Sequence, residues 1–139
     1  MKILAFDTAL RACSVAVCSG DRVLANCFES RSRGHAEVLI PTINQVCADA
    51  GVEMADLDRV AVTVGPGTFA GVRIGIAAAR GLSVALSLPV VGVTTLEAVA
   101  AATARNLRNG EIHVTVVFDA RRGQVYVQSF DADLQPLGT

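Results

Sequence analysis

The chain has 139 residues, of which 52% are hydrophobic, which is enough for one compact domain or for one domain and part of another. A net charge of -1 and a charged fraction of 18% exclude a bulk basic field that would hold a nucleic acid unaided. Five phenylalanines, one tyrosine and no tryptophan leave little material for stacking on exposed bases. Any action on RNA would therefore depend on another subunit.

Hydrophobic periodicity predicts alternating strands and helices. Apolar and β-branched runs predict strands at residues 3–6, 12–19, 22–30, 59–64, 90–93, 112–119 and 124–130. Helical spacing predicts helices at residues 35–50, at residues 69–86, and from a capping box at Thr94 and Glu97 to about residue 106. The order βββαβαβα followed by ββ indicates an α/β fold in which an antiparallel start joins a parallel continuation.

The second hairpin repeats a formula of the first. Residues 6–9 read FDTA and residues 118–121 read FDAR, so in both hairpins the first strand ends in aspartate. We therefore expect one complete lobe over residues 1–108 and the incomplete start of a second, similar lobe over residues 109–139. The expected linker covers residues 107–111, where Asn109 and Gly110 break the preceding helix.

The cysteines and one long apolar run bear on where the protein works. The four cysteines form no CxxC pair, no signal peptide precedes them, and three lie in apolar contexts, a pattern that predicts free thiols in a reducing cytoplasm. Residues 74–93 are apolar enough to suggest a membrane span. Arg80 interrupts this run, and Pro89 and Gly92 break it, so we predict no contact with a membrane.

The stretch GPGTFAGVRIG, residues 65–75, joins a buried strand to the longest helix. Within the helix, Gly71, Gly75 and Ala79 recur at every fourth position and form a nearly flat ridge. Glycine inside a helix costs roughly 1 kcal/mol relative to alanine, so a close contact should compensate for it. Because a flat ridge lets two helix axes approach closely, we predict that it packs against another helix.

The same stretch also fits a loose dinucleotide-binding pattern through Gly65, Gly67 and Ala70. No acidic residue lies between Asp58 and Glu97, so the ribose-binding acid expected about 20 residues further on is missing. A Gly-Lys-Ser/Thr phosphate loop is also absent from the sequence. A tight turn that leads into a helix is at least as good an interpretation.

Polar residues at the two strand ends are a second candidate for phosphate chemistry. Asp7 and Thr8, facing Asp119 across a cleft, could hold magnesium and phosphates, and Arg121 could contact a phosphate. Alternatively, each carboxylate caps its own turn and the arginine is solvated. The residue types favour turn capping.

Histidine chemistry has weak support. His35 begins the first helix, but the position four residues on, where a second metal ligand would lie, is Leu39. The other histidine, His113, falls in a predicted strand. We therefore predict no histidine metal centre and expect His35 to cap or flank the helix start.

Five segments taken together resemble the TsaB (YeaZ) family of tRNA threonylcarbamoyladenosine biosynthesis subunits: MKILAFDTALRACSVAV, RGHAEVLIPTI, GPGTFAGVRIGIAAARGL, LPVVGVTTLEAVA and FDARRGQVYV. The match covers nearly the whole chain in order. It implies an actin-like (ribonuclease H-like) ATPase fold of two similar lobes, and a role in modifying the adenosine next to the anticodon. A full member continues through the second lobe, so we expect the hairpin at residues 112–130 to be poorly supported or to pair with another chain.

The resemblance also implies a non-catalytic scaffold. The related catalytic subunit TsaD holds its metal with two helix histidines four positions apart, of which His35 matches the first and Leu39 replaces the second. Such a scaffold pairs with TsaD, the ATPase TsaE joins the pair, and homodimers form in their absence. The tRNA is then reached only through the complex. No cofactor is expected on this chain alone, and ATP or ADP with magnesium would belong to the full complex.

The family's dimers use the helix after GPG and the helix after His35. The contact residues that carry over are Gly71, Val72, Ile74, Gly75 and Ala78, with Val38, Leu39 and Thr42 as weaker candidates. Three alternatives stay open. The first is an ATP-dependent phosphotransferase of the same fold, which would need Asp7 and Asp119. The second is a glycoprotease-like metalloprotease, against which Leu39 argues. The third is an α/β lobe without retained activity.

Overall fold

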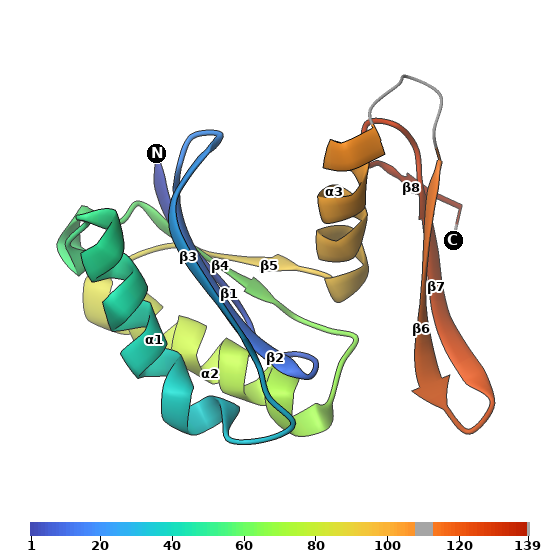
Figure 1. Cartoon of the computed structure of the whole chain (residues 1–139), viewed down its shortest axis with the longest axis horizontal. Coiled ribbons are helices and arrows are strands. Elements are labelled where there is room, and N and C mark those ends of the chain that lie inside the picture. The colour runs from blue at the N-terminus through green and yellow to red at the C-terminus, as the bar shows by residue number, and fades with distance from the viewer. Residues whose placement is uncertain (108–112, 139) are drawn as a thin grey trace. The chain divides into compact units, whose positions relative to one another are not determined.

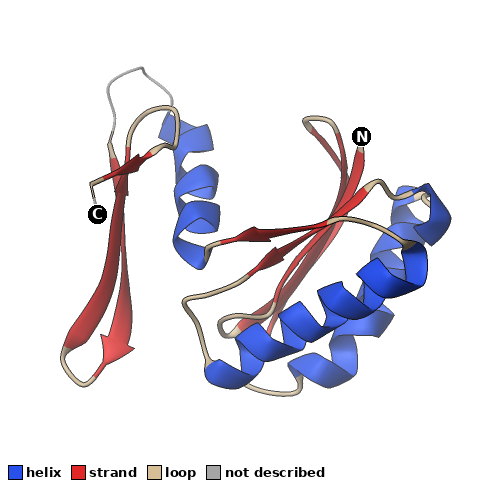
Figure 2. Cartoon of the chain, turned by 180° about the vertical axis from the view of Figure 1, so that it is seen from behind, coloured by secondary structure: helices blue, strands red, loops and turns tan. Residues whose placement is uncertain are grey.

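The computed structural model describes residues 1–107 and 113–138, which form two compact units, Met1–Val93 and Thr94–Thr139. The first unit is a five-stranded sheet covered on one face by two long helices (Figures 1 and 2). The second unit is a helix packed on a three-stranded sheet.

The first sheet has mixed direction. Its strands are β1 (Lys2–Asp7), β2 (Ala12–Ser19), β3 (Arg22–Ser30), β4 (Arg59–Thr63) and β5 (Val90–Val93), in the order β3-β2-β1-β4-β5. Strands β1, β2 and β3 pair antiparallel, whereas β4 pairs parallel with β1 and β5 pairs parallel with β4. The predicted antiparallel start and parallel continuation are therefore confirmed.

Both long helices, α1 (His35–Ala50) and α2 (Phe69–Leu86), begin and end where the sequence predicted. The short 3-10 helix η1 (Met54–Asp56) follows α1. Alternation along β1 turns Leu4 and Phe6 toward the helices, where they meet Leu39 and Ile43 of α1. One continuous core thus joins the sheet to α1 and α2.

Local signals fix the helix ends. Gly51 adopts a left-handed conformation, with φ of 65°, and its N–H donates to the carbonyls of Ala48 and Cys47. This conformation suits glycine because it has no Cβ to clash. At the start of α2, the Thr68 hydroxyl accepts a hydrogen bond from the Gly71 N–H at 3.0 Å.

The second unit contains α3 (Thr95–Leu107), β6 (Val114–Arg121), β7 (Gln124–Phe130) and β8 (Pro136–Leu137). The predicted capping box is confirmed, since the Thr94 N–H donates to Glu97 at 2.8 Å and the Glu97 N–H donates to the Thr94 hydroxyl at 3.1 Å. Ala100 of α3, Val116 of β6 and Phe130 of β7 form a small buried core.

This core bears on two predictions. The first compact unit ends at Val93, because α3 packs on β6 and β7, whereas the predicted lobe boundary lies after residue 108. Helix α3 covers one face of the hairpin, where Phe130 is fully buried, whereas Val117, Val125 and Val127 are exposed. The expectation that the hairpin is poorly supported or pairs with another chain therefore stays a prediction. Of the predicted linker, residues 108–111 lie outside the described residues.

Candidate functional site

The turn after β1 is held by its own aspartate. Asp7 Oδ1 accepts hydrogen bonds from the Ala9 N–H at 2.9 Å and from the Thr63 hydroxyl at 2.5 Å. The carboxylate thereby joins the turn to the end of β4. The prediction that Asp7 caps its own turn is confirmed, and the Thr63 contact was not predicted because it joins residues 56 positions apart.

The neighbouring Thr8 is 1% exposed and faces α2. Its hydroxyl donates to the Gly71 carbonyl at 2.7 Å. A Cβ on Gly71 would overlap the Thr8 carbonyl and lie 2.6 Å from the Thr68 hydroxyl, and a Cβ on Gly75 would lie 2.9 Å from the Thr8 hydroxyl. The glycines of α2 therefore make room for the chain's own first strand.

This packing corrects the predicted role of the glycine ridge. Gly71 and Gly75 are buried, and their close neighbours are Thr8, Thr68 and Val62 of the same unit. The prediction that the ridge packs against another helix is wrong, because the end of β1 and the side chain of Val62 in β4 occupy that position. Both glycines therefore face the sheet of their own unit.

The GPG turn also packs closely against the segment that follows β1. A Cβ on Gly67 would lie 2.8 Å from the Ala9 Cβ, and the Thr68 N–H donates to the Ala9 carbonyl at 2.8 Å. The Gly71 N–H is engaged by the Thr68 hydroxyl. These two amides at the start of α2 are therefore bonded within the chain, which favours the tight-turn interpretation over a phosphate cradle.

Asp119 repeats the local chemistry of Asp7 in the second unit. Its Oδ1 accepts a hydrogen bond from the Arg121 N–H at 2.7 Å, so it also caps its own turn. Asp119 and Arg121 are exposed at the tip of the β6–β7 hairpin. Phosphate binding by Asp7, Thr8, Asp119 and Arg121 stays a prediction.

His35 lies at the buried start of α1, where it is 8% exposed. Its Nε2 lies 3.0 Å from the Leu10 carbonyl, while Leu39, four residues on, is packed in the core. Within the described residues, no group of three or more His, Cys, Asp or Glu side chains could hold a metal ion. His35 thus flanks the helix start, as predicted, but its ring contacts the turn after β1 and makes no capping hydrogen bond to α1.

The buried cysteines behave as apolar side chains. Burial raises the pKa of the Cys13 thiol, with a smaller contribution from the Glu29 carboxylate, and burial also raises the pKa of the Cys47 thiol. Cys13, Cys18, Cys27 and Cys47 are all free. A thiol with a raised pKa is a poor nucleophile at neutral pH, so neither buried cysteine has the character of a catalytic residue.

The outer face of α2 is the feature that sequence reasoning missed. Phe69 is 76% exposed and Val84 is 83% exposed, and between them Arg73, Ala77 and Arg80 are also exposed. The Arg73 guanidinium lies 4.3 Å from the Phe69 ring centroid. The four-residue spacing of Phe69, Arg73 and Ala77 could have revealed this stripe, but the glycine ridge repeats at the same spacing.

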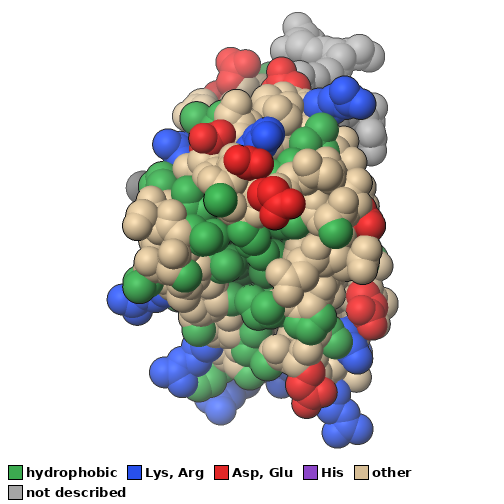
Figure 3. Space-filling view, turned by 90° about the vertical axis from the view of Figure 1, so that its left-hand side faces the viewer, with side chains coloured by type: hydrophobic (Ala, Val, Ile, Leu, Met, Phe, Trp, Pro, Cys, Tyr) green, Lys and Arg blue, Asp and Glu red, His purple; other side chains and the backbone are tan. Residues whose placement is uncertain are grey.

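The predicted contact residues therefore divide by exposure. Leu39, Gly71 and Gly75 are buried and cannot lie on an outer contact surface. The other predicted contact residues are half-buried: Val38, Thr42, Val72, Ile74 and Ala78. Seen from the side on which α1 and α2 lie in Figure 1, the molecule shows a strip of hydrophobic side chains with charged ones around it (Figure 3).

Residues 22–139 match the family model described as "TsaD: tRNA N6-adenosine threonylcarbamoyltransferase". The chain belongs to this family. TsaB, the tRNA threonylcarbamoyladenosine biosynthesis protein of Escherichia coli K12, is 40% identical over 133 residues, which are 96% of this chain and 56% of that protein. TsaB of Bacillus subtilis 168 is 35% identical over 126 residues, which are 91% of this chain and 53% of that protein. The chain spans about half the length of the curated relatives it matches.

Solved structures agree with this membership of the TsaD family. YeaZ from Pseudomonas aeruginosa matches with a TM-score of 0.90 and 34% identity, over 99% of this chain and 65% of that one. A ROK hexokinase from Thermus thermophilus matches with a TM-score of 0.55 and 20% identity, over 99% of this chain and 49% of that one, which shows the fold alone. The predicted resemblance to TsaB (YeaZ) and the predicted actin-like α/β fold are confirmed.

Proposed function

We propose that this chain belongs to a non-catalytic scaffold subunit of the cytoplasmic complex that installs threonylcarbamoyl on the adenosine next to the anticodon of tRNAs. In this role it pairs with the catalytic subunit TsaD, TsaE joins the pair, and a homodimer forms when they are absent. The names of its relatives support a place in the biosynthesis of threonylcarbamoyladenosine in tRNA. The tRNA is reached only through the complex, in keeping with a net charge of -1.

The observation that carries this proposal is the exposed apolar face of α2. Three of its 18 residues are buried, and the large hydrophobic side chains of Phe69 and Val84 are 76% and 83% exposed. A contiguous strip of exposed hydrophobic side chains, such as the one in Figure 3, is typical of an interaction site. By length and composition alone the helix could cross a membrane, but Arg73 and Arg80 on its exposed side favour a protein partner.

Helix α1 extends this surface beside α2, which it contacts. Its exposed Ala36, Ile40 and Asn44 lie at four-residue spacing and carry no charge. We therefore assign the partner surface to Phe69, Arg73, Ala77 and Val84 of α2 together with this stripe of α1. The predicted half-buried residues Val72, Ile74 and Ala78 would lie beneath it.

The residues that a catalytic site would use support the non-catalytic assignment, because they are buried in the core or hydrogen-bonded within the unit. The position of TsaD's second metal-binding histidine is occupied by Leu39, which is 1% exposed in the core. The Thr8 hydroxyl and Asp7 Oδ1, two groups that a phosphate site would use, are bonded inside the unit. We therefore assign nucleotide and magnesium binding to the full complex rather than to this chain.

The test measures binding of the chain to TsaD from the same organism by analytical ultracentrifugation. Val84→Asp places a carboxylate on the proposed surface, where we expect affinity to fall at least about ten-fold, or about 1.4 kcal/mol. The matched control is Val91→Asp, which alters an exposed valine of β5 at the opposite edge of the same sheet and should leave affinity unchanged. Equal affinity of the wild type and Val84→Asp would refute the assignment.

A further inference from the structure

A groove of about 540 Å³ lies between the edge strand β3 and helix α1. Apolar groups of Cys27, Val38 and Pro41 line it together with the acidic side chains of Glu29, Glu37 and Asp49. Among the described residues, none that lines it is a lysine or an arginine. The groove therefore combines apolar side chains with acidic ones.

Strand β3 offers a free sheet edge along this groove. It is the outermost strand of the five-stranded sheet, and β2 is the strand that it pairs with in the described part of the chain. At nine residues it is also the longest strand of that sheet. Such an edge presents N–H and C=O groups that can add another strand.

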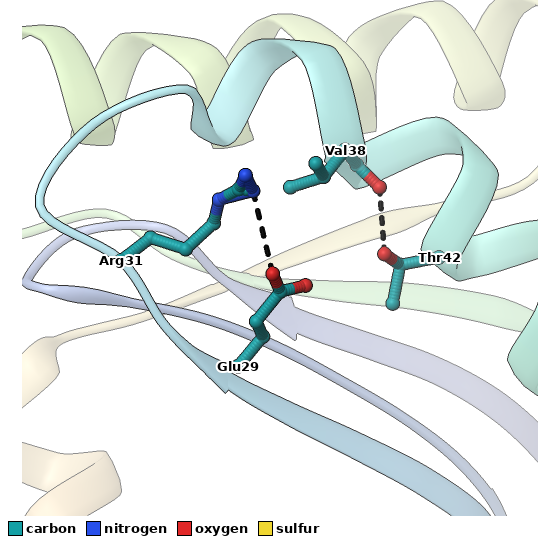
Figure 4. A network of polar contacts seen from close by, with 4 residues as sticks. All are labelled: Glu29, Arg31, Val38 and Thr42. Atoms are coloured by element: carbon teal, nitrogen blue, oxygen red, sulfur yellow. Dashed lines mark hydrogen bonds and ion pairs between the residues drawn. The ribbon is translucent and has the colours of Figure 1, made fainter.

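A cation of the chain, Arg31, lies next to this groove but is not among the side chains that line it. The Arg31 guanidinium pairs with the Glu29 carboxylate at 3.3 Å and lies between β3 and α1, near Val38 (Figure 4). Its Nε is buried without a hydrogen-bond partner in the described part of the molecule. Arg31 thus shows the chemistry that suits this groove: a guanidinium against a carboxylate beside an aliphatic side chain.

The other two carboxylates are available to a ligand. Asp49 Oδ1 accepts one hydrogen bond from the Gln45 amide at 2.8 Å, and Glu37 forms no ion pair within the described residues. Twelve residue steps separate them along α1, which is about 18 Å at 1.5 Å per residue. An extended segment crosses that length in about six residues.

We propose that the edge of β3 binds an extended, basic segment of another protein, which adds a strand to the sheet and places lysine or arginine side chains against Glu37 and Asp49. Backbone hydrogen bonds to β3 give the segment its direction, and the carboxylates select its charge. A second copy of this chain fits less well, because pairing two β3 edges would bring two acidic grooves together.

This site is separate from the surface proposed for TsaD. Pro41, Gln45 and Asp49 lie on the groove side of α1, whereas Ala36 and Ile40 belong to the stripe assigned to the TsaD contact. Neighbouring positions on a helix point about 100° apart. Either proposal can therefore fail without affecting the other.

The probe is a fluorescein-labelled peptide of alternating lysine and threonine, with about eight residues so that it spans the groove at about 3.3 Å per residue. Fluorescence anisotropy with the full chain should show saturable binding. The charge reversals Glu37→Lys and Asp49→Lys, made together, should weaken binding at least about ten-fold. The matched control reverses two exposed acids outside the groove, Glu53→Lys with Asp56→Lys, and should change binding less than about two-fold.

Two further peptides separate strand addition from simple charge attraction. A peptide with glutamate in place of lysine, and one with alternate backbone amides methylated along one edge, should each bind at least about ten-fold more weakly. Equal binding of the methylated peptide, or equal loss in the control variant, would overturn the proposal. Absence of peptide binding, together with a sedimentation mass that doubles with concentration, would assign the edge to a second copy and also overturn it.

Discussion

The two faces of α2 carry small residues at the same four-residue spacing and have opposite roles. On the inner face, Gly71 and Gly75 let the end of β1 approach the helix. On the outer face, Ala77 and Gly81 are exposed, and a Cβ on Gly81 would meet no atom within 4 Å. A repeat of small residues therefore identifies a close contact only when the element that fills the gap is known.

The largest expected effect comes from adding one methyl group to the inner face. Gly71→Ala should destabilise the first unit by about 2–3 kcal/mol, because its Cβ would overlap the Thr8 carbonyl and displace the Thr68 hydroxyl. Urea denaturation followed by circular dichroism measures this change in the free energy of unfolding.

The matched control is the same substitution on the outer face. Gly81→Ala should raise the free energy of unfolding by about 0.5–1 kcal/mol, since alanine is the better helix former and the added methyl meets open space. If both variants shift stability in the same direction, the distinction between the two faces fails.

Removing the hydrogen bond from Thr8 should have the next largest effect. Thr8→Val keeps the shape of the side chain but leaves the buried Gly71 carbonyl without its hydroxyl donor, at a cost of about 1–3 kcal/mol. Thr8→Ser keeps the donor and should recover part of the loss. Thermal denaturation compares the stabilities of the two variants. Equal stability of Thr8→Val and Thr8→Ser would contradict a contribution of this hydrogen bond.

The N-cap of α2 should contribute less. Thr68→Ala removes the acceptor for the Gly71 N–H and should cost about 1 kcal/mol. Because Thr68 is exposed, this cost reflects the lost cap rather than lost packing. Thr68→Ser should match the wild type in the same urea experiment, and a serine variant as unstable as the alanine variant would argue against the cap.

The smallest effect concerns pH. The raised pKa values of Cys13 and Cys47 mean that the folded chain holds these thiol protons more tightly than the unfolded chain. Their contribution to stability is therefore full below the unfolded pKa of about 8.5 and is lost as pH rises through the folded values. The urea midpoint should therefore decrease as pH rises above that value. It should decrease less steeply in the double variant Cys13→Ala, Cys47→Ala. The same slope of midpoint against pH in both proteins would contradict this.

Most elements could be predicted because their signals are local. The ends of α1 and α2 follow from periodicity together with Gly51 and Thr68, and the capping box at Thr94 fixes the start of α3. The turn-capping role of Asp7 and Asp119 could also be predicted, since each carboxylate bonds an amide two residues on.

Contacts between distant segments could not be predicted in this way. The pairing of Thr63 with Asp7 and the anchoring of His35 on Leu10 join residues far apart in sequence. The grouping of α3 with β6 and β7 likewise depends on packing around Phe130, which the predicted linker at residues 107–111 did not reveal.

The sequence by itself determined the order of strands and helices, their caps and the resemblance to TsaB, because periodicity, capping and motif spacing act over a few residues. Only the tertiary structure decided which face of α2 is buried. Gly71 and Ala77 are both small residues on one helix, and the choice between them depends on Thr8, which lies 63 residues before Gly71 and reaches it only when β1 and α2 pack together.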